Sequence, residues 1–214
     1  MSKKSLYLVD GSTLIFRAYF AIRHLSNSKG LPTNAVYGFT SMLRKLIRDH
    51  APDYLVVVFD KSAQTFRNEL YPAYKAHRPP APEDLVPQFG LVRDVTKALN
   101  IHSLEMEGFE ADDIIATLAK AYEGTLKTVI VSSDKDLMQL VTEDTSMLDT
   151  MKNIRYSAPE VVEKMGVEFG ANGAPLAATW SASPRTRCSC SRYASAKAGR
   201  RPSPSPSTKA RPSR

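Results

Sequence analysis

The sequence has few of the features that build membrane-bound or disulfide-stapled proteins. Only two of its 214 residues are cysteines, Cys188 and Cys190, which excludes a secreted fold built on a disulfide framework. No apolar run approaches the roughly 18 residues that a membrane span needs. The apolar run at residues 6–9 is too short for the core of a signal peptide, so we expect a cytoplasmic protein.

Acidic residues are missing from the C-terminal end of the chain. Residues 171–214 contain nine of the 29 basic residues and none of the 22 acidic ones. Residues 1–170 therefore hold 20 basic and 22 acidic side chains, a net charge of −2. Because the formal net charge of +7 comes from the C-terminal end, it gives no information about what the rest of the chain binds.

Composition also divides the chain near residue 170. Ser, Pro, Ala and Arg supply 31 of the 44 residues from 171 to 214, where Ile, Val and Phe are missing. Such a segment cannot bury enough apolar surface to offset its chain entropy. We therefore predict a folded domain at 1–169 and a disordered basic tail at 170–214. The tail is either a natural basic arm that tracks phosphates or the product of a reading frame that slipped near Phe169.

Strands and helices are expected to alternate within the folded domain. Short apolar runs predict strands at 6–9, 55–59, 101–105 and 128–131. Helical spacing and a capping box at Ser157 predict helices near 34–49, 88–99, 110–122 and 158–166. The alternation predicts an α/β fold, a parallel sheet with helices on both faces. The polar stretch 61–86 is expected to be a long loop, which is usually functional.

Aspartates follow three of the predicted strands. They are Asp10, Asp60 and Asp134. The carboxyl ends of parallel strands share one edge of a sheet, where ligands bind. Four more acids complete the set: Glu110, Asp112, Asp113 and Asp136. Each acid alone has a structural explanation, since Asp caps helices and the helix dipole favours acids in a first turn.

The seven acids together predict a metal site. Gathered at one edge they would repel one another by an amount on the order of several kcal/mol unless cations lie among them. Oxygen-only ligands favour Mg²⁺ or Mn²⁺ over structural zinc. Two such ions, about 4 Å apart, can activate a water and stabilise the leaving oxygen in phosphodiester hydrolysis.

Basic and aromatic residues are interleaved after Asp60. Residues 61–80 contain the basic residues Lys61, Arg67, Lys75 and Arg78 against one acid, Glu69. Tyr71 and Tyr74 lie between them and can stack on unpaired bases while the cations hold the backbone. The alternative is a solvated loop.

Five stretches of the sequence carry a family resemblance. In order they are LYLVDGSTLIFRAYFA, NAVYGFTSML, VVVFDKSAQTFRNELYPAYKAHRPP, EGFEADDIIATLA and VIVSSDKDLMQLV. They resemble the 5′-nuclease domain at the N-terminus of bacterial DNA polymerase I, which is related to stand-alone flap endonucleases. The resemblance covers about residues 5–169. It implies a PIN-like, Rossmann-like α/β fold with a helical-arch insertion after the second strand, and a two-metal nuclease that removes RNA primers and 5′ flaps.

The resemblance also implies roles for individual residues. The seven acids named above match the family's metal-site acids. Arg67, Lys75 and Arg78 match basic residues of the helical arch through which the single strand threads, and Lys75 and Arg78 would steer the scissile phosphate. Arg17 and Tyr19 resemble positions near the threaded 5′ end.

The resemblance stops after residue 169. The family continues into two further metal-site aspartates and a helix–three-turn–helix that grips the duplex, and neither is present in this sequence. This departure favours the slipped reading frame over a natural arm. We therefore expect a 5′-3′ exonuclease and flap endonuclease of DNA replication and repair, impaired by truncation. The alternative is a non-catalytic nucleic-acid-binding remnant. The sequence gives no indication of a membrane or an obligate protein partner.

A third hypothesis is a phosphatase with an aspartate nucleophile on a similar sheet. Such enzymes need a second Asp two residues beyond the one that ends the first strand. Here that position is Ser12, which is expected to cap the following helix instead. The phosphatase hypothesis is therefore weaker than the nuclease hypothesis.

Overall fold

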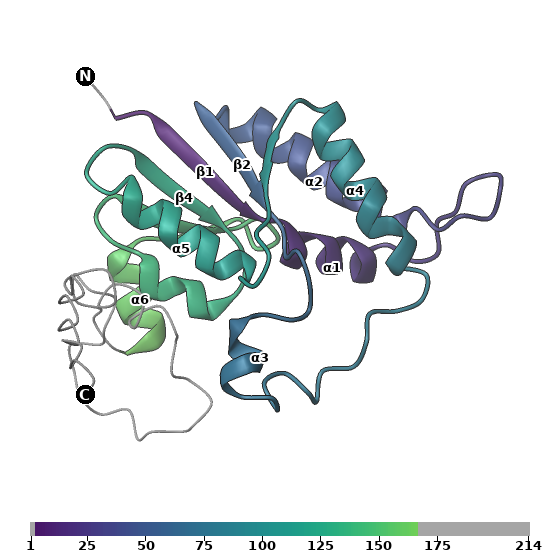
Figure 1. Cartoon of the computed structure of the whole chain (residues 1–214). Coiled ribbons are helices and arrows are strands. Elements are labelled where there is room, and N and C mark those ends of the chain that lie inside the picture. Colours follow the sequence, from purple (N-terminus) through teal and green to yellow (C-terminus); the bar gives the residue numbers. More distant parts are fainter. Residues whose placement is uncertain (1–2, 167–214) are drawn as a thin grey trace, which may run out of the picture.

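A six-stranded sheet forms the centre of the protein (Figure 1). The structure is a computed structural model that describes residues 3–166. The strands are β1 (Ser5–Asp10), β2 (Tyr54–Val58), β3 (His102–Leu104), β4 (Lys127–Val131), β5 (Thr145–Asp149) and β6 (Ile154–Tyr156). Their order across the sheet is β3-β2-β1-β4-β5-β6. β1 to β5 are parallel and β6 pairs antiparallel with β5, so the predicted α/β sheet is confirmed.

Helices cover both faces of the sheet. They are α1 (Gly11–Ala21), α2 (Asn34–His50), α3 (Phe66–Leu70), α4 (Val86–Ala98), α5 (Ala111–Ala121), α6 (Ala158–Met165) and the 3₁₀ helix η1 (Lys135–Leu140). One face packs against α1, α2 and α4, and the other against α5, η1 and α6 (Figure 1). The prediction of helices on both faces is confirmed.

Alternation along β1 explains why the sheet is covered twice. Tyr7 and Val9 belong to the core beneath α1, α2 and α4, whereas Leu6 and Leu8 belong to the core beneath α5. Successive side chains of a strand point to opposite faces, so a strand without polar residues needs cover on both sides. The apolar runs that predicted the central strands therefore also predicted that helices cover both faces of the sheet.

The predicted ranges leave out four elements, namely α3, η1, β5 and β6, and they give no bounds for the helix expected after the first strand, which is α1. β5, which reads TSMLD, carries three polar residues although all five of its residues are buried. Patterns that depend on turn residues or on β-branched runs cannot detect such elements.

A long insertion connects the end of β2 to the start of α4. We call residues 61–85 the insertion segment; it contains the five-residue helix α3 and several turns (Figure 1). α3 has no buried side chain. The stretch predicted as a long loop is therefore largely that, with one short helix.

Two expectations concern other parts of the chain. The predicted tail at 170–214 lies outside the described residues. Within residues 3–166, no helix combines the length and the apolar character that crossing a membrane requires.

Gly11 permits a close approach between β1, α1 and β2. A Cβ at this position would lie 2.5 Å from Cε1 of Phe59 and 2.9 Å from Cγ1 of Val57. Phe59 and Val57 are buried core residues that cannot move without disturbing the sheet. The glycine therefore fixes how near Asp10, before it, can come to Asp60, after Phe59.

Replacing Gly11 by alanine is expected to destabilise the fold. The added methyl overpacks a filled core, which costs about 1–3 kcal/mol of unfolding free energy. Gly90→Ala is the matched control, since Gly90 lies in the exposed face of α4 with open space around it and is expected to gain about 0.5–1 kcal/mol. Urea denaturation measures both. A Gly11→Ala protein as stable as the parent would contradict the close approach.

Candidate functional site

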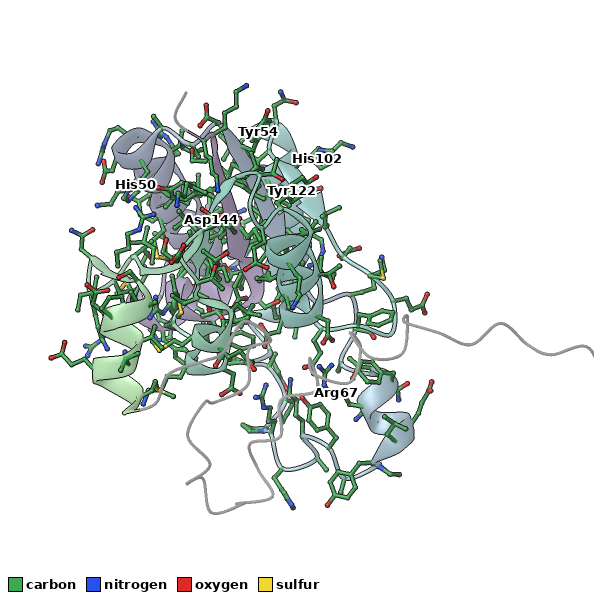
Figure 2. The ribbon with its side chains drawn as sticks, turned by 90° about the vertical axis from the view of Figure 1, so that its left-hand side faces the viewer. His50, Tyr54, Arg67, His102, Tyr122 and Asp144 are labelled. Carbon is green, nitrogen blue, oxygen red and sulfur yellow. The ribbon has the colours of Figure 1, made fainter. Side chains whose placement is uncertain are left out.

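The carboxyl ends of β2, β1 and β4 lie side by side at one edge of the sheet. β1 is the neighbour of both β2 and β4, and all three strands run in the same direction. Figure 2 shows Arg67 of the insertion segment at this end of the domain, opposite His50, Tyr54 and His102 at the amino ends of the strands. The edge where the sequence predicts ligand binding is thus the one that the insertion segment covers.

Asp10 ends β1 and is buried, with 3% of its surface exposed. Its Oδ1 accepts a hydrogen bond from the backbone N–H of Thr13 at 2.9 Å and caps α1. Its Oδ2 accepts one from Oγ of Ser132 at 2.8 Å. Burial raises the pKa of Asp10 in spite of these bonds, and the charge of Asp60 raises it further. Asp10 is therefore both a helix cap and part of an acidic group.

Ser132 connects Asp10 to Asp134. Its Oγ accepts a hydrogen bond from the N–H of Asp134 at 3.1 Å while it donates to Asp10. Asp134 in turn caps η1 by accepting from the N–H of Asp136 at 3.0 Å. Asp134 is therefore the cap of η1, and the general explanation of an aspartate as a helix cap does not apply to Asp136. The sequence did not single out Ser132, although it lies within the quoted stretch VIVSSDKDLMQLV.

Three helices hold Asp60. Its N–H donates to Oγ of Ser12 in α1 at 3.2 Å, and its carbonyl oxygen accepts from Nη2 of Arg93 in α4 at 3.0 Å. Its Oδ1 accepts from the N–H of Ala111, the first residue of α5, at 2.7 Å. Ser12 thus positions Asp60, and its expected role as the cap of α1 is wrong because Asp10 caps that helix. No local pattern distinguishes Arg93 from an ordinary surface arginine, so the sequence missed it.

Asp112 is surrounded by other carboxylates. Burial raises its pKa to about 8, and the charges of Asp10, Asp134, Asp60 and Glu110 act in the same direction. Burial is the larger cause, and the four charges indicate that these acids lie near enough to Asp112 to act on it. That they form a metal site stays a prediction.

Asp136 lies at the exposed rim of this group. Burial and the charge of Asp134 raise its pKa, while Lys75 lowers it. The insertion segment therefore brings positive charge to this side of the edge.

Glu110 and Asp113 are paired with the insertion segment. Nζ of Lys75 lies 2.6 Å from Oε1 of Glu110, and the hydroxyl of Tyr74 donates to Oε2 at 3.2 Å. Arg67 donates from Nη1 and Nη2 to the two oxygens of Asp113, at 2.7 and 2.6 Å. These acids also form the capping box that starts α5, so their structural explanation as helix-start residues holds as well.

The residues predicted to bind nucleic acid differ in exposure and pairing. Nη1 of Arg17 lies 3.1 Å from Oδ1 of Asp149, a buried acid that the sequence missed. The hydroxyl of Tyr19 donates to Oδ1 of Asp84 at 2.7 Å. Tyr71 is exposed. Arg78 is also exposed and follows Lys75 in a turn.

The carboxylates are gathered but are not in a ligating arrangement. Within residues 3–166, no group of three or more His, Cys, Asp or Glu side chains has the geometry to hold a metal ion. Hydrogen bonds and ion pairs take up the oxygens of Asp10 and Asp113. The donor chemistry, oxygen only and mutually repelling, nevertheless suits a hard divalent cation.

Comparison with known families assigns the chain to one of them. Residues 5–166 match the family model described as "5′-3′ exonuclease, N-terminal resolvase-like domain". The chain belongs to the 5′-3′ exonuclease family. Among its curated relatives, DNA polymerase I of Rhizobium leguminosarum is 54% identical over 171 residues. A 5′-3′ exonuclease of Aquifex aeolicus is 45% identical over 166 residues.

The chain spans only part of these relatives. The match to the Rhizobium polymerase covers 76% of this chain and 17% of the polymerase, and the match to the Aquifex exonuclease covers 77% and 57%. Among solved structures, the T5 D15 protein co-crystallised with metal ions has a TM-score of 0.62 at 24% identity, covering 77% of this chain and 62% of that one. That likeness establishes the fold, which agrees with the family resemblance of the sequence.

The raised pKa of Asp112 predicts a pH-dependent stability. Its folded pKa of about 8 exceeds the ordinary value of 3.8, so between these pH values the folded state retains a proton that the unfolded state has released. In metal-free buffer, the unfolding free energy of the parent should therefore fall relative to Asp112→Asn as the pH rises from about 4 to about 8.

Asp144→Asn is the control for this measurement. Hydrogen bonds from Lys127 and Lys3 lower the pKa of Asp144 to about 2, so its titration lies below the tested window. This variant should keep the pH dependence of the parent. Urea denaturation at several pH values measures all three proteins, and parallel curves for the parent and Asp112→Asn would contradict the crowding of carboxylates.

Proposed function

We propose that this chain is a metal-dependent 5′-3′ exonuclease and flap endonuclease that hydrolyses phosphodiesters at the 5′ end of DNA. The carrying observation is the crowding of carboxylates around Asp112 at the carboxyl edge of the sheet. Acids that repel one another at low solvation raise their own pKa values unless divalent cations neutralise them. Membership of the 5′-3′ exonuclease family supports the same proposal.

Six of the seven predicted acids are proposed to hold the ions. Asp10, Asp60, Asp112 and Asp134 form the inner group around the raised pKa of Asp112, and Glu110 and Asp136 lie beside it. Two bound Mg²⁺ or Mn²⁺ ions would supply an activated water and stabilise the leaving oxygen. Ser132 and Ala111 would orient the carboxylates of Asp10 and Asp60 by donating hydrogen bonds to them, and Ser12 would hold the backbone of Asp60 by accepting its N–H.

The insertion segment is proposed to bind the DNA strand. Lys75 and Arg78 would hold and steer the phosphate next to the acidic edge, and Arg67 would support them from α3. Tyr71, which is exposed, and Tyr74 would stack on unpaired bases. Arg17 and Tyr19 in α1 would lie near the 5′ end, Arg17 being oriented by Asp149.

The substrate is proposed to be a DNA 5′ flap or 5′ end, with RNA primers as a further substrate, in cytoplasmic replication and repair. We expect an activity weaker than that of an intact relative, because residues 170–214 contain neither the two further metal-site aspartates nor the duplex-gripping motif that the family resemblance implies. We propose that residues 1–169 are the nuclease domain. Residues 170–214 are proposed to be a tail whose sequence comes from a slipped reading frame.

A second candidate is a nucleic-acid-binding remnant without catalysis. It is favoured by the carboxylates of residues 3–166, which as placed do not form a ligating group. Such a remnant would bind DNA through the basic residues of the insertion segment, and its affinity would fall steeply with salt.

A 5′-labelled DNA flap incubated with the full chain and Mn²⁺ tests the proposal. The parent should cleave the flap only with the metal, and Asp60→Asn should reduce the rate by about a hundredfold or more, because several kcal/mol of charge stabilisation are lost. Asp94→Asn, on the outer surface of α4, is the matched control and should retain the parent rate. Salt-sensitive binding without cleavage by the parent would support the remnant instead.

A further inference from the structure

The first turn of α5 presents two neighbouring aspartates to two different environments. Asp112 and Asp113 are consecutive, and successive residues of an α-helix point about 100° apart. They therefore cannot face the same set of partners. Asp112 is grouped with Asp10, Asp60 and Asp134, whereas Asp113 faces Arg67 of the insertion segment.

Both oxygens of Asp113 are engaged by one guanidinium. Arg67 donates from Nη1 to Oδ2 at 2.7 Å and from Nη2 to Oδ1 at 2.6 Å. Oδ2 also accepts from the N–H of Glu110 at 3.1 Å. Two parallel charge-assisted bonds are the strongest pairing that a carboxylate makes with a side chain, and a cation would have to displace them to bind Asp113.

The pair lies in a place that strengthens it. The side chains of Arg67 and Asp113 are 12% and 16% exposed. The guanidinium carbon lies 4.7 Å from the ring centre of Phe66, and the ring of Tyr74 lies 5.9 Å away. Burial alone lowers the pKa of Arg67, but Asp113 and Glu110 outweigh it and raise the pKa. The guanidinium stays charged and shielded from water.

The insertion segment needs such an anchor. α3 is a five-residue helix with no buried side chain, too short to be stable alone and without an apolar face to dock. Its other contacts include the bridge from Thr65 to Gly108, the ring contact of Phe66 with Phe109 and the contacts of Arg67, Tyr74 and Lys75 with Glu110. Among these, the pair of Arg67 and Asp113 joins α3 directly to the helix that carries Asp112.

We propose that Asp113 is a positioning residue that anchors the insertion segment through Arg67, and that it does not bind the divalent ions. The sequence and the family resemblance predicted Asp113 as a metal ligand, a prediction that this assignment replaces. The inference rests on the proposed nuclease function, since it divides the acidic edge into a metal-binding group and a segment-anchoring pair. The anchor holds Lys75 and Arg78 over the group around Asp112.

The test measures metal binding and segment opening separately on the full chain. Calorimetric titration with Mn²⁺ gives the affinity, and limited trypsin digestion gives the cleavage rate after Lys75. Asp113→Asn and Arg67→Met should each raise that cleavage rate by about tenfold, because the segment opens more often. Both should leave the Mn²⁺ affinity within about threefold of the parent, and Arg67→Lys should fall between parent and Arg67→Met.

Two controls complete the design. Asp112→Asn should lower the Mn²⁺ affinity by about tenfold or more without changing the trypsin rate. Lys61→Met removes the more exposed pair with Glu105 at the start of the same segment, and should change neither quantity. The double variant of Arg67→Met and Asp113→Asn should open no faster than Arg67→Met alone, since Arg67→Met already removes the pair with Asp113 together with the 3.4 Å ion pair of Arg67 with Glu110.

The inference is overturned if Asp113→Asn weakens Mn²⁺ binding by more than about threefold, or if it leaves the trypsin rate unchanged. Folding of each variant is checked by its urea midpoint, and the conservative Arg67→Lys variant preserves the charge if Arg67→Met unfolds. A parent that binds no Mn²⁺ would contradict the proposed function. In that case the trypsin rates would still decide whether Asp113 anchors the segment.

Discussion

Repulsion among carboxylates at the carboxyl edge of the sheet is the constraint on which the site depends. Asp10, Asp60 and Asp134 would separate if the chain were free, and the burial of Asp112 among them raises its pKa to about 8. The sheet prevents separation because two cores, one on each face, fix the strands that carry these acids. Backbone N–H groups of Thr13, Ala111 and Asp136 donate to the same carboxylates and offset part of the repulsion.

Strand register decides which way the acids point. Asp10 lies opposite Val58 of β2, and Val9 lies opposite Val131 of β4, so the ends of the three strands are level. A slip of one residue in β1 would turn Asp10 to the other face of the sheet and move its apolar neighbours into cores packed for other side chains. Val9 and Val58 are completely buried, so the two cores oppose such a slip.

Sequence patterns located the edge but not the contacts that shape it. Apolar runs predicted β1, β2 and β4, and with them the positions of Asp10, Asp60 and Asp134, because strand ends are local features. The bonds from Arg93 to Asp60, from Ser132 to Asp10 and from Arg17 to Asp149 join residues 33, 122 and 132 positions apart. A periodic pattern of apolar residues gives no information about contacts between residues so far apart in the sequence. The same limit explains why Ser12 was expected to cap α1 and instead accepts the N–H of Asp60.

The first turn of α5 joins the acidic edge to the insertion segment. Its helix dipole favours acids at Glu110, Asp112 and Asp113, which alone would explain all three. Their partners differ, however: Lys75 and Arg67 neutralise Glu110 and Asp113, while Asp112 has other carboxylates around it. One turn of a helix therefore carries both the proposed metal-binding acid Asp112 and the two acids that hold the insertion segment, so the position of α5 sets the distance between the acidic edge and Lys75.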